Sequence, residues 1–479
     1  MARATEVEAR SATRRRRTLL GVLVLVVGLV WVASAMKPAV SAGLAYKAKT
    51  LCSELFVAGR ALDDVLRDLE VDDLRPLRFI RAEVDPSQRL VTTGVLIARR
   101  QAQFLDGRGC ILGPPRGQES MVSQRPSVHG TASSSAMEKA AAVQTEFSAG
   151  LEQVLDAAFQ ETVGRPHKRT RAVVVVHRGE IVAERYAPGF GPETPLLGWS
   201  MTKSVMNALI GAAIQAGRLD LNEPTGLRAW SGPGDGRAAI TVSDLLRMSS
   251  GLEFGEDQAN LSSDLFRMLY AERDMAGFAS GKRLVAEPST LWKYSSGTSV
   301  ILSQVLREKV GEEAYKSFPR TALFEPLGLT QAVLEQDGVG TFMGASYLYA
   351  TAREWARIGQ LYLQDGVWQD KRILPVGWVE YSRTPAPADP HGAYGAHFWV
   401  STPLEYRGRP VPLPADAFHA AGHEAQFVTI VPSRNVVVVR MGQTRYAKAW
   451  EHDQFIAGIL AALEDGGASD DLLSEKPAA

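Results

Sequence analysis

The sequence has 479 residues, of which 45% are hydrophobic and 22% are charged, a balance typical of folded globular proteins. Lysine plus arginine and aspartate plus glutamate each number 53, so no overall positive charge favours nucleic acid as a partner. This length allows two to four domains, or one large domain with extensions.

The first element predicted along the chain is a membrane anchor. Residues 1–17 end in four arginines and form a basic cytoplasmic tail, and the uncharged residues 18–36 follow. As a helix, residues 18–36 would span about 28 Å, close to the thickness of a bilayer's hydrocarbon core. Because the arginines should stay in the cytoplasm, we expect a single-pass protein of the cell (inner) membrane, with its body in the periplasm or outside the cell. The alternative is secretion after signal cleavage, since Ala33-Ser34-Ala35 resembles a cleavage site.

Residues 41–112 form a small exported segment that contains both cysteines of the chain. Its apolar spacing predicts a helix over 53–70, and residues 89–104 read as a strand entering a turn. In an oxidising compartment Cys52 and Cys110 can form a disulfide, and the alternative is two unpaired cysteines.

The main domain is expected over residues 138–465, between a Gly-, Pro- and Ser-rich linker at 113–137 and a disordered polar tail at 466–479. It should begin with an amphipathic helix over 137–161. A β-hairpin over 171–187, turning at Arg178-Gly179, should follow.

Mostly helices and loops are expected from residue 200 to residue 390. One helix runs from Ser200 to Gly217, a second over 240–252 has Ser243 or Asp244 as its N-cap, and a third over 350–366 ends at Gly366.

Strands return near the C-terminus at 394–400, 426–432 and 435–442, and a final helix covers 449–465. The resulting fold class is α/β (α+β): an antiparallel sheet flanked by N- and C-terminal helices, with an inserted helical domain. A cleft between the sheet and this insertion is the expected place for a site.

Ser200 and Lys203, in the segment GWSMTKSV, carry the candidate chemistry. Residues three apart share one face of a helix, so the two side chains should touch. The helix that follows is apolar nearly all round and therefore buried, which should lower the pKa of Lys203. An uncharged lysine can take the proton of a serine nucleophile, and the backbone N–H of Ser200 can donate to an oxyanion.

The Ser-x-x-Lys spacing alone is weak evidence for catalysis, because Ser34 and Lys37 repeat it at the end of the predicted membrane segment. The alternative for Ser200 is a helix N-cap whose lysine reaches solvent. Two further elements favour catalysis. Tyr294 and Ser296 come just before another apolar helix, and the segment HAAGHEAQFVTIVP approaches a strand whose edge can supply a second oxyanion N–H.

Together, SMTK, YSS and GHEAQ resemble the motifs of the serine β-lactamase-like hydrolases, which include class C β-lactamases and penicillin-binding proteins. The resemblance covers about residues 140–463 and is nearest to the branch of 6-aminohexanoate-dimer hydrolases and esterases. It implies an enzyme without a cofactor or a metal that hydrolyses a small ester or amide.

The resemblance also implies a role for each matching residue. Ser200 is the acylated nucleophile, Lys203 its base, and Tyr294 the proton shuttle to the leaving group. The backbone N–H of His423 is the second oxyanion donor. Substrate-lining positions are Ser296, Gly422 and Gln426.

The sequence departs from the β-lactamase pattern at one motif. Ala420-Ala421-Gly422 stands where β-lactamases have Lys-Thr-Gly, so the cation and hydroxyl that hold a substrate carboxylate are missing. Ester or amide hydrolysis survives this change, because it needs only acylation and an oxyanion hole.

Three alternatives stay open at this stage. The first is a penicillin-recognising D-Ala-D-Ala peptidase or β-lactamase, and the second is a non-catalytic envelope protein that uses the same fold for binding. The third is a metal hydrolase built on His419, His423 and Glu424. The oligomeric state is not encoded in any pattern that we recognise.

Overall fold

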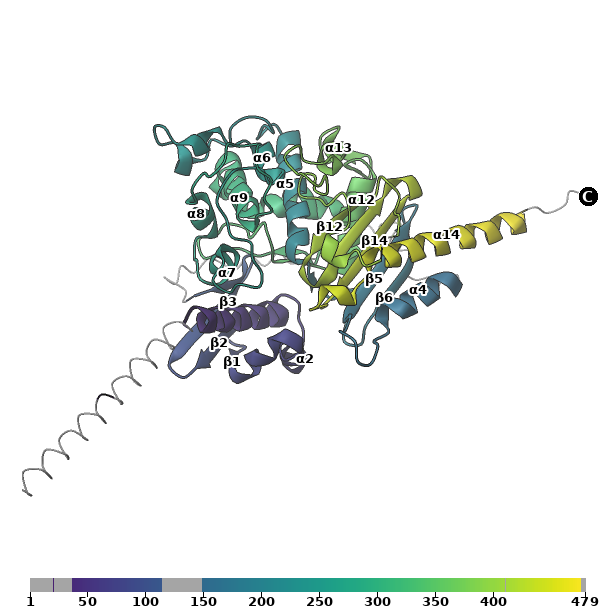
Figure 1. Ribbon diagram of the computed structural model, residues 1–479, viewed down its shortest axis with the longest axis horizontal. Coiled ribbons are helices and arrows are strands. Elements are labelled where there is room, and N and C mark those ends of the chain that lie inside the picture. The colour runs from purple at the N-terminus through teal and green to yellow at the C-terminus, as the bar shows by residue number, and fades with distance from the viewer. Residues whose placement is uncertain (1–19, 21–36, 114–148, 410, 475–479) are drawn as a thin grey trace, which may run out of the picture.

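The structure is a computed structural model that describes Leu20 and residues 37–113, 149–409 and 411–474 (Figure 1). The predicted cytoplasmic tail at 1–17 lies outside the described residues. The predicted membrane segment at 18–36 also lies outside them except for Leu20, and the predicted linker at 113–137 except for Gly113. Within the described part, no helix has the length and apolar character needed to cross a membrane.

Residues 37–113 form a compact N-terminal unit. A helix over 37–56 packs on a four-stranded antiparallel sheet in the order β1-β2-β3-β4. The bounds in this unit are α2 (Leu62–Asp68), η1 (Asp72–Phe79), β1 (Arg81–Asp85), β2 (Leu90–Val95), β3 (Ala98–Leu105) and β4 (Gly109–Leu112). The helix predicted over 53–70 is in fact two helices, because Gly59 adopts a φ of 69° between them. The strand and turn predicted at 89–104 are confirmed as the β2–β3 hairpin.

The main domain contains a five-stranded antiparallel sheet in the order β12-β13-β14-β5-β6. Its bounds are β5 (Thr170–His177), β6 (Glu180–Tyr186), β12 (Phe418–Gly422), β13 (Gln426–Val431) and β14 (Val436–Gly442). The predicted interruption is confirmed, since β14 pairs with β5 across the whole helical insertion. Arg178 and Gly179 adopt φ values of 53° and 88°, as a tight hairpin turn requires.

Helices cover both faces of this sheet, which explains why its central strands are runs of valine (Figure 1). On one face lie α4 (Ala149–Phe159) and α14 (His452–Ser474), and on the other lies α12 (Ala352–Leu363). Gly359 lets α12 approach closely, because a Cβ at this position would lie 2.6 Å from Val437.

The helical insertion is built around two of its own helices, α5 (Thr202–Gln215) and α9 (Ser296–Val310), which are buried and contact each other. Around them lie α6 (Val242–Leu246), α7 (Asp264–Tyr270), α8 (Met275–Ser280), α10 (Glu312–Pro319), η5 (Arg320–Phe324), α11 (Glu325–Leu327) and α13 (Trp378–Arg383). Three short strands form a small sheet beside α5: β7 (Leu196–Leu197), β8 (Val333–Leu334) and β9 (Leu348–Ala350). A two-stranded ribbon joins β10 (Val367–Trp368) and β11 (Lys371–Arg372).

Three predicted elements need correction. Residues 394–400 are not a strand, because His397 has a φ of 58° and its ring bonds the backbone of the helical insertion instead. The N-cap of α6 is Thr241, which forms a capping box with Asp244. The backbone of α14 continues to Ser474, so the tail predicted as disordered from residue 466 is helical up to that point.

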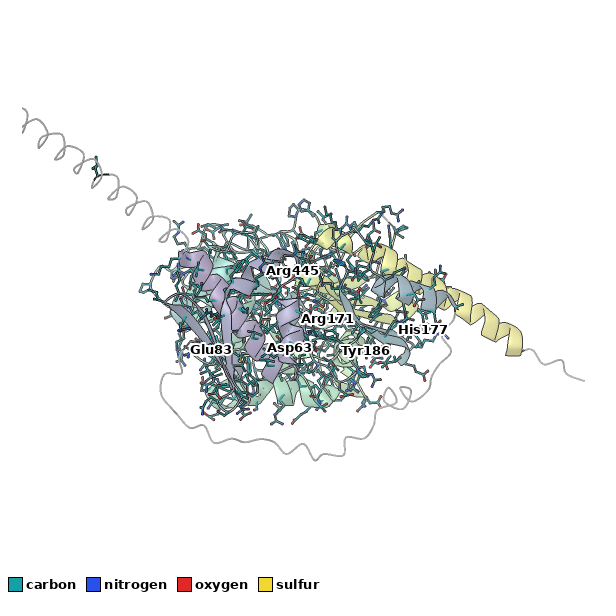
Figure 2. All side chains as sticks on the ribbon, turned by 90° about the horizontal axis from the view of Figure 1, so that it is seen from below. Asp63, Glu83, Arg171, His177, Tyr186 and Arg445 are labelled. Atoms are coloured by element: carbon teal, nitrogen blue, oxygen red, sulfur yellow. A yellow bond between two sulfur atoms is a disulfide. The ribbon has the colours of Figure 1, made fainter. Side chains whose placement is uncertain are left out.

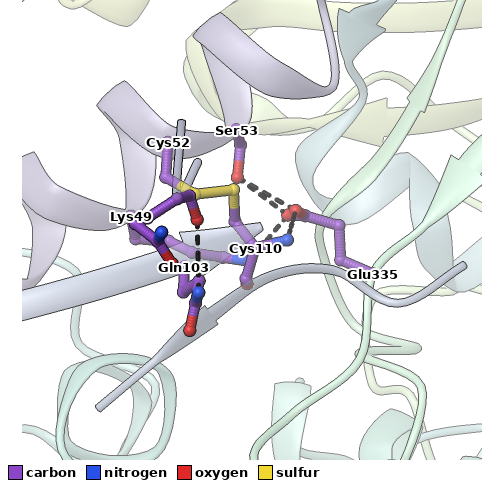
Figure 3. The surroundings of a disulfide bond; sticks show 7 residues. Lys49, Cys52, Ser53, Gln103, Cys110 and Glu335 are labelled. Atoms are coloured by element: carbon purple, nitrogen blue, oxygen red, sulfur yellow. Dashed lines mark hydrogen bonds and ion pairs between the residues drawn. A yellow bond between two sulfur atoms is a disulfide. The ribbon is translucent and has the colours of Figure 1, made fainter. Parts of the chain in front are cut away.

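The N-terminal unit is tied to the main domain by a buried ion pair and by surface ion pairs. Lys49 lies 2.7 Å from Glu335, whose carboxylate also accepts from the Ser53 hydroxyl and from the Cys110 N–H (Figure 3). The predicted disulfide between Cys52 and Cys110 is present in this cluster. Along the same boundary Arg171 pairs with Asp68 and Arg445 with Asp73. Figure 2 labels the two arginines. The unit therefore has a fixed position beside the cleft.

Candidate active site

Ser200 lies in a short 3₁₀ turn, Trp199–Met201, that leads directly into α5. The turn has a strained entry, because Trp199 has a φ of 48°, a region that non-glycine residues rarely occupy. Gly198 precedes it, and a Cβ there would collide with the indole of Trp355. Packing behind the turn thus fixes the direction of the Ser200 side chain.

Lys203 is 1% exposed and lies one helical turn after Ser200. Its Nζ atom is 2.9 Å from Ser200 Oγ, 3.1 Å from Ser296 Oγ and 3.1 Å from the carbonyl oxygen of Ala345. Burial lowers the pKa of Lys203 to about 8, and the nearby carboxylate of Glu256 opposes this shift. The amine is therefore uncharged in a substantial fraction of molecules near neutral pH.

Tyr294 approaches the same pair from the loop before α9, and its hydroxyl is near enough to the Ser200 side chain for Ser200 to influence its pKa. Lys203 Nζ lies 4.9 Å from the centre of the Tyr294 ring. The ring stacks on Trp399 and packs edge-on against Tyr394, so its orientation is fixed. Burial and the Glu256 carboxylate both raise the pKa of Tyr294, whereas the Ser200 side chain lowers it. The three residues predicted to meet do meet.

Ser296 connects this group to a carboxylate that the sequence analysis missed. The backbone N–H and the hydroxyl of Ser296 both donate to Glu256. Burial raises the pKa of Glu256, and the positive charge of Lys203 opposes the shift. Glu256 lies in a loop of the insertion without helical or strand periodicity, so no sequence signal pointed to it.

The end of β12 lies against the backbone of the nucleophile turn. A Cβ on Gly422 would collide with the Gly198 carbonyl oxygen and come within 3.2 Å of Ser200 N. Only glycine therefore allows this approach, which brings His423, the next residue, beside Ser200. An oxyanion hole needs two N–H donors close together.

Glu424 couples the turn after β12 to the turn that carries Ser200. Glu424 and Ala425 have φ values of 64° and 60°, so two successive non-glycine residues are strained there. The Glu424 carboxylate accepts from Trp199 Nε1 at 3.2 Å and from Arg445 Nη1 at 2.5 Å. Arg445 also lies 3.3 Å from His423 Nε2. This network joins the two halves of the site.

One predicted role, that of Gln426, does not fit the structure, and the residues of the metal alternative have other partners. Gln426 is buried, and its amide bonds both backbone groups of Gly442, at 2.6 and 2.9 Å, so it holds β13 to β14 rather than facing the cleft. His419 is also buried and its Nδ1 bonds the Thr429 hydroxyl, whereas His423 contacts Arg445. Among the residues whose positions are described, no group of three His, Cys, Asp or Glu could hold a metal ion.

A cavity of about 770 Å³ opens in front of Ser200. Ser200, Ser296, Glu256 and His423 line its inner end, and the N-terminal unit contributes much of its wall. This volume lies within the usual range for small-molecule sites. The site is therefore a serine that lines a substrate-sized cavity, with a lysine and a tyrosine beside it.

The comparisons with known proteins agree with this geometry. The Beta-lactamase family model matches residues 155–461. A 6-aminohexanoate-dimer hydrolase of Paenarthrobacter ureafaciens is 26% identical over 227 residues, 44% of this chain and 56% of the relative. The chain thus matches little more than half the length of that relative.

Two solved structures share the fold. A Bacillus anthracis protein provisionally assigned as a 6-aminohexanoate-dimer hydrolase has a TM-score of 0.52 and 21% identity, over 68% of this chain and 83% of that one. A protein from Bacteroides dorei DSM 17855, provisionally assigned as a β-lactamase, has a TM-score of 0.51 and 18% identity, over 65% and 96%.

Proposed function

The chain belongs to the Beta-lactamase family, and we propose that it is a serine hydrolase that cleaves small esters or amides through an acyl-enzyme on Ser200. The observation that carries this proposal is the 2.9 Å contact between a buried lysine of lowered pKa and the Ser200 hydroxyl. Such a contact activates a serine as a nucleophile.

In the proposed mechanism Ser200 Oγ attacks the substrate carbonyl carbon while its proton passes to Lys203 Nζ. The N–H groups of Ser200 and His423 stabilise the negative oxygen that forms. The bond to the leaving group then breaks, and Tyr294 delivers a proton to the departing oxygen or nitrogen. Water attacks the acyl-enzyme by the same proton path in reverse, which releases the acid and restores Ser200.

An ester or amide fits this site better than a β-lactam does. Ala420 and Ala421 are buried in β12 at the positions where a β-lactamase holds its substrate carboxylate. The Arg445 guanidinium, which lines the cavity, is already paired with Asp73 and Glu424. The matching relative is named for hydrolysis of an amide dimer, which supports amides as one substrate class.

The proposal includes an anchor at residues 18–36 and a hydrolase domain that faces the periplasm or the cell exterior. Its support is the uncharged segment after four arginines, together with the Cys52–Cys110 disulfide, since disulfides persist mainly in oxidising compartments. Labelling of intact cells with a membrane-impermeant amine reagent, which reacts with exposed lysines, tests this placement.

Activity-based labelling tests the chemistry. The full chain should react with a serine-directed fluorophosphonate and hydrolyse p-nitrophenyl acetate, and Ser200→Ala should abolish both. Ser231→Ala is the matched control, because Ser231 is exposed and remote from the cavity lining. Labelling retained in Ser200→Ala would reject the proposal.

The same preparation separates the alternatives. Stoichiometric acylation by a fluorescent penicillin would favour a penicillin-recognising enzyme. No turnover across a panel of esters, amides and peptides would favour a binding protein on the same fold.

A further inference from the structure

The cavity in front of Ser200 has a mostly apolar lining. Its polar lining residues include Glu256, Asp73 and Arg445. The apolar wall comes from both parts of the molecule. Representative residues of this apolar wall are Val40, Leu77 and Phe79 from the N-terminal unit, and Leu261, Leu265 and Leu269 from the insertion.

The cavity lies on one side of the nucleophile. Ser296 and Glu256 line it, whereas Tyr294, which is close to Ser200, is not among its lining residues. In the proposed mechanism Tyr294 serves the leaving group. The cavity is therefore the place for the acyl part of the substrate, which stays on Ser200 after the first step.

An apolar wall of this extent indicates a long acyl group. Burial of each methylene gains free energy only if the surrounding wall is apolar, and most of the wall here is apolar. The N-terminal unit builds half of that wall, which gives this extension of the chain a role in substrate choice.

The outer end of the cavity lies beside an exposed apolar tip. Leu96 and Ile97, at the turn of the β2–β3 hairpin, are 93% and 99% exposed, and Val95 before them lines the cavity. Phe79, another lining residue, is 68% exposed. The hairpin is held against the start of helix 37–56, since Arg100 donates to Ser41 Oγ at 2.6 Å.

This tip has the composition of a lipid-contacting surface. The side chains of Leu96 and Ile97 are exposed rather than packed in a core, and the exposed Arg99 and Arg100 follow shortly after them in the sequence. Apolar residues inserted among headgroups, with arginines toward anionic lipids, form the usual pattern of interfacial binding. The helix behind the tip begins directly after the uncharged segment 18–36.

We propose that the cavity binds the linear aliphatic acyl chain of an amphiphilic ester or amide that enters from a lipid surface at the Leu96–Ile97 tip. This inference rests on the proposed function, because it names the substrate class of the same site.

A chain-length series tests the cavity. With the full chain in detergent, kcat/KM for p-nitrophenyl esters should rise from acetate to decanoate by up to about fourfold per added methylene until the cavity is full.

Val40→Trp, which narrows the outer cavity, should lower kcat/KM for decanoate about tenfold and leave acetate unchanged. Ala259→Trp, on an exposed loop of the opposite wall, should do the same even if Val40→Trp folds poorly. Leu62→Trp, outside the cavity lining, is the control.

A vesicle assay tests the entry surface. The full chain is reconstituted in phosphatidylcholine–phosphatidylglycerol vesicles that contain a fluorogenic decanoyl ester. Leu96→Asp combined with Ile97→Asp should lower vesicle hydrolysis about tenfold, without changing hydrolysis of dispersed acetate. Val163→Asp, at a site 99% exposed on another part of the surface, should have no effect.

Two results would overturn the inference: equal kcat/KM for acetate and decanoate, or vesicle hydrolysis that is indifferent to charges at the tip. Failure to hydrolyse any ester, acetate included, would instead count against the proposed function.

Discussion

The Nζ atom of Lys203 lies 2.9 Å from the Oγ atom of Ser200, and the lysine side chain is almost completely removed from solvent. In water the amine would be protonated and useless as a base. Burial in the apolar surroundings of α5 changes that, so a packing feature of the fold sets the chemistry of the site.

The first prediction concerns the pH dependence of this pair. Because burial lowers the pKa of Lys203 to about 8 and the uncharged form is the base, kcat/KM for an ester should rise with pH through an inflection near that value. Steady-state hydrolysis measured from about pH 6 to 10 checks this. A rate that is flat or falls across that range would contradict the role given to Lys203.

The second prediction concerns the charge of Glu256. Its carboxylate raises the pKa of Lys203 against the effect of burial, so Glu256→Gln should move the inflection to lower pH. Glutamine has nearly the same shape: its Oε1 can accept from the Ser296 N–H and its NH2 can donate to the Ser296 hydroxyl, so the site should keep its shape. The same pH series on the variant measures the shift, and an inflection that stays in place or moves upward would refute the coupling.

The third prediction concerns the approach of β12 to Ser200. Gly422→Ala should lower kcat about 100- to 1000-fold, the effect of losing one oxyanion donor, because its Cβ would push the strand end from the nucleophile turn. Gly191→Ala, where a Cβ would meet open space, is the control. Circular dichroism should show both variants folded; near-normal kcat in Gly422→Ala would argue against His423 as a donor.

The fourth prediction concerns the buried ion pair between the two parts of the molecule. Lys49 and Glu335 have side chains that are 2% and 0% exposed, so Glu335→Gln leaves a buried charge unpaired and should cost about 3–5 kcal/mol of unfolding free energy. Replacing both partners, Lys49→Met with Glu335→Leu, should recover much of that loss. Denaturant titration measures both.

A surface pair serves as the reference for this experiment. Glu253 and Arg283 are bonded but largely exposed, so Glu253→Gln should cost less than about 1 kcal/mol. Equal losses in the buried and exposed variants would show that the Lys49–Glu335 contact does not secure the N-terminal unit.

The fifth prediction concerns acid stability. Burial lowers the pKa of His419 to about 3, whereas an unfolded histidine titrates near about 6.5. Below about pH 6.5 the unfolded chain binds a proton at His419, whereas the folded chain does not bind it until about pH 3. The free energy of unfolding that is present at neutral pH therefore falls as the pH falls, by about 2 kcal/mol at about pH 5. His419→Asn, whose amide can still meet Thr429, should remove this share of the pH dependence in denaturant titrations at the two pH values.

Features that depend on neighbouring residues could be read from the sequence. The hairpin turn at Arg178-Gly179 is confirmed because its backbone conformation is a local property of those two residues. The contact of Ser200 with Lys203 is confirmed because helical spacing alone brings them together. Where a local signal was ambiguous, as at the N-cap of α6, the prediction of Ser243 or Asp244 missed Thr241 by two or three residues.

The sequence by itself therefore determined four of the five strands of the sheet, its helical interruption and the Ser200–Lys203 pair, since each follows from periodicity or short spacing. Only the tertiary structure decided that Glu256 faces Lys203, that Glu424 bonds Trp199, and that Gln426 turns toward Gly442 and away from the cleft. It also decided that the N-terminal unit walls the substrate cavity. These contacts join residues far apart in the chain, and which distant side chains meet is set by the packing of the whole core rather than by any local pattern.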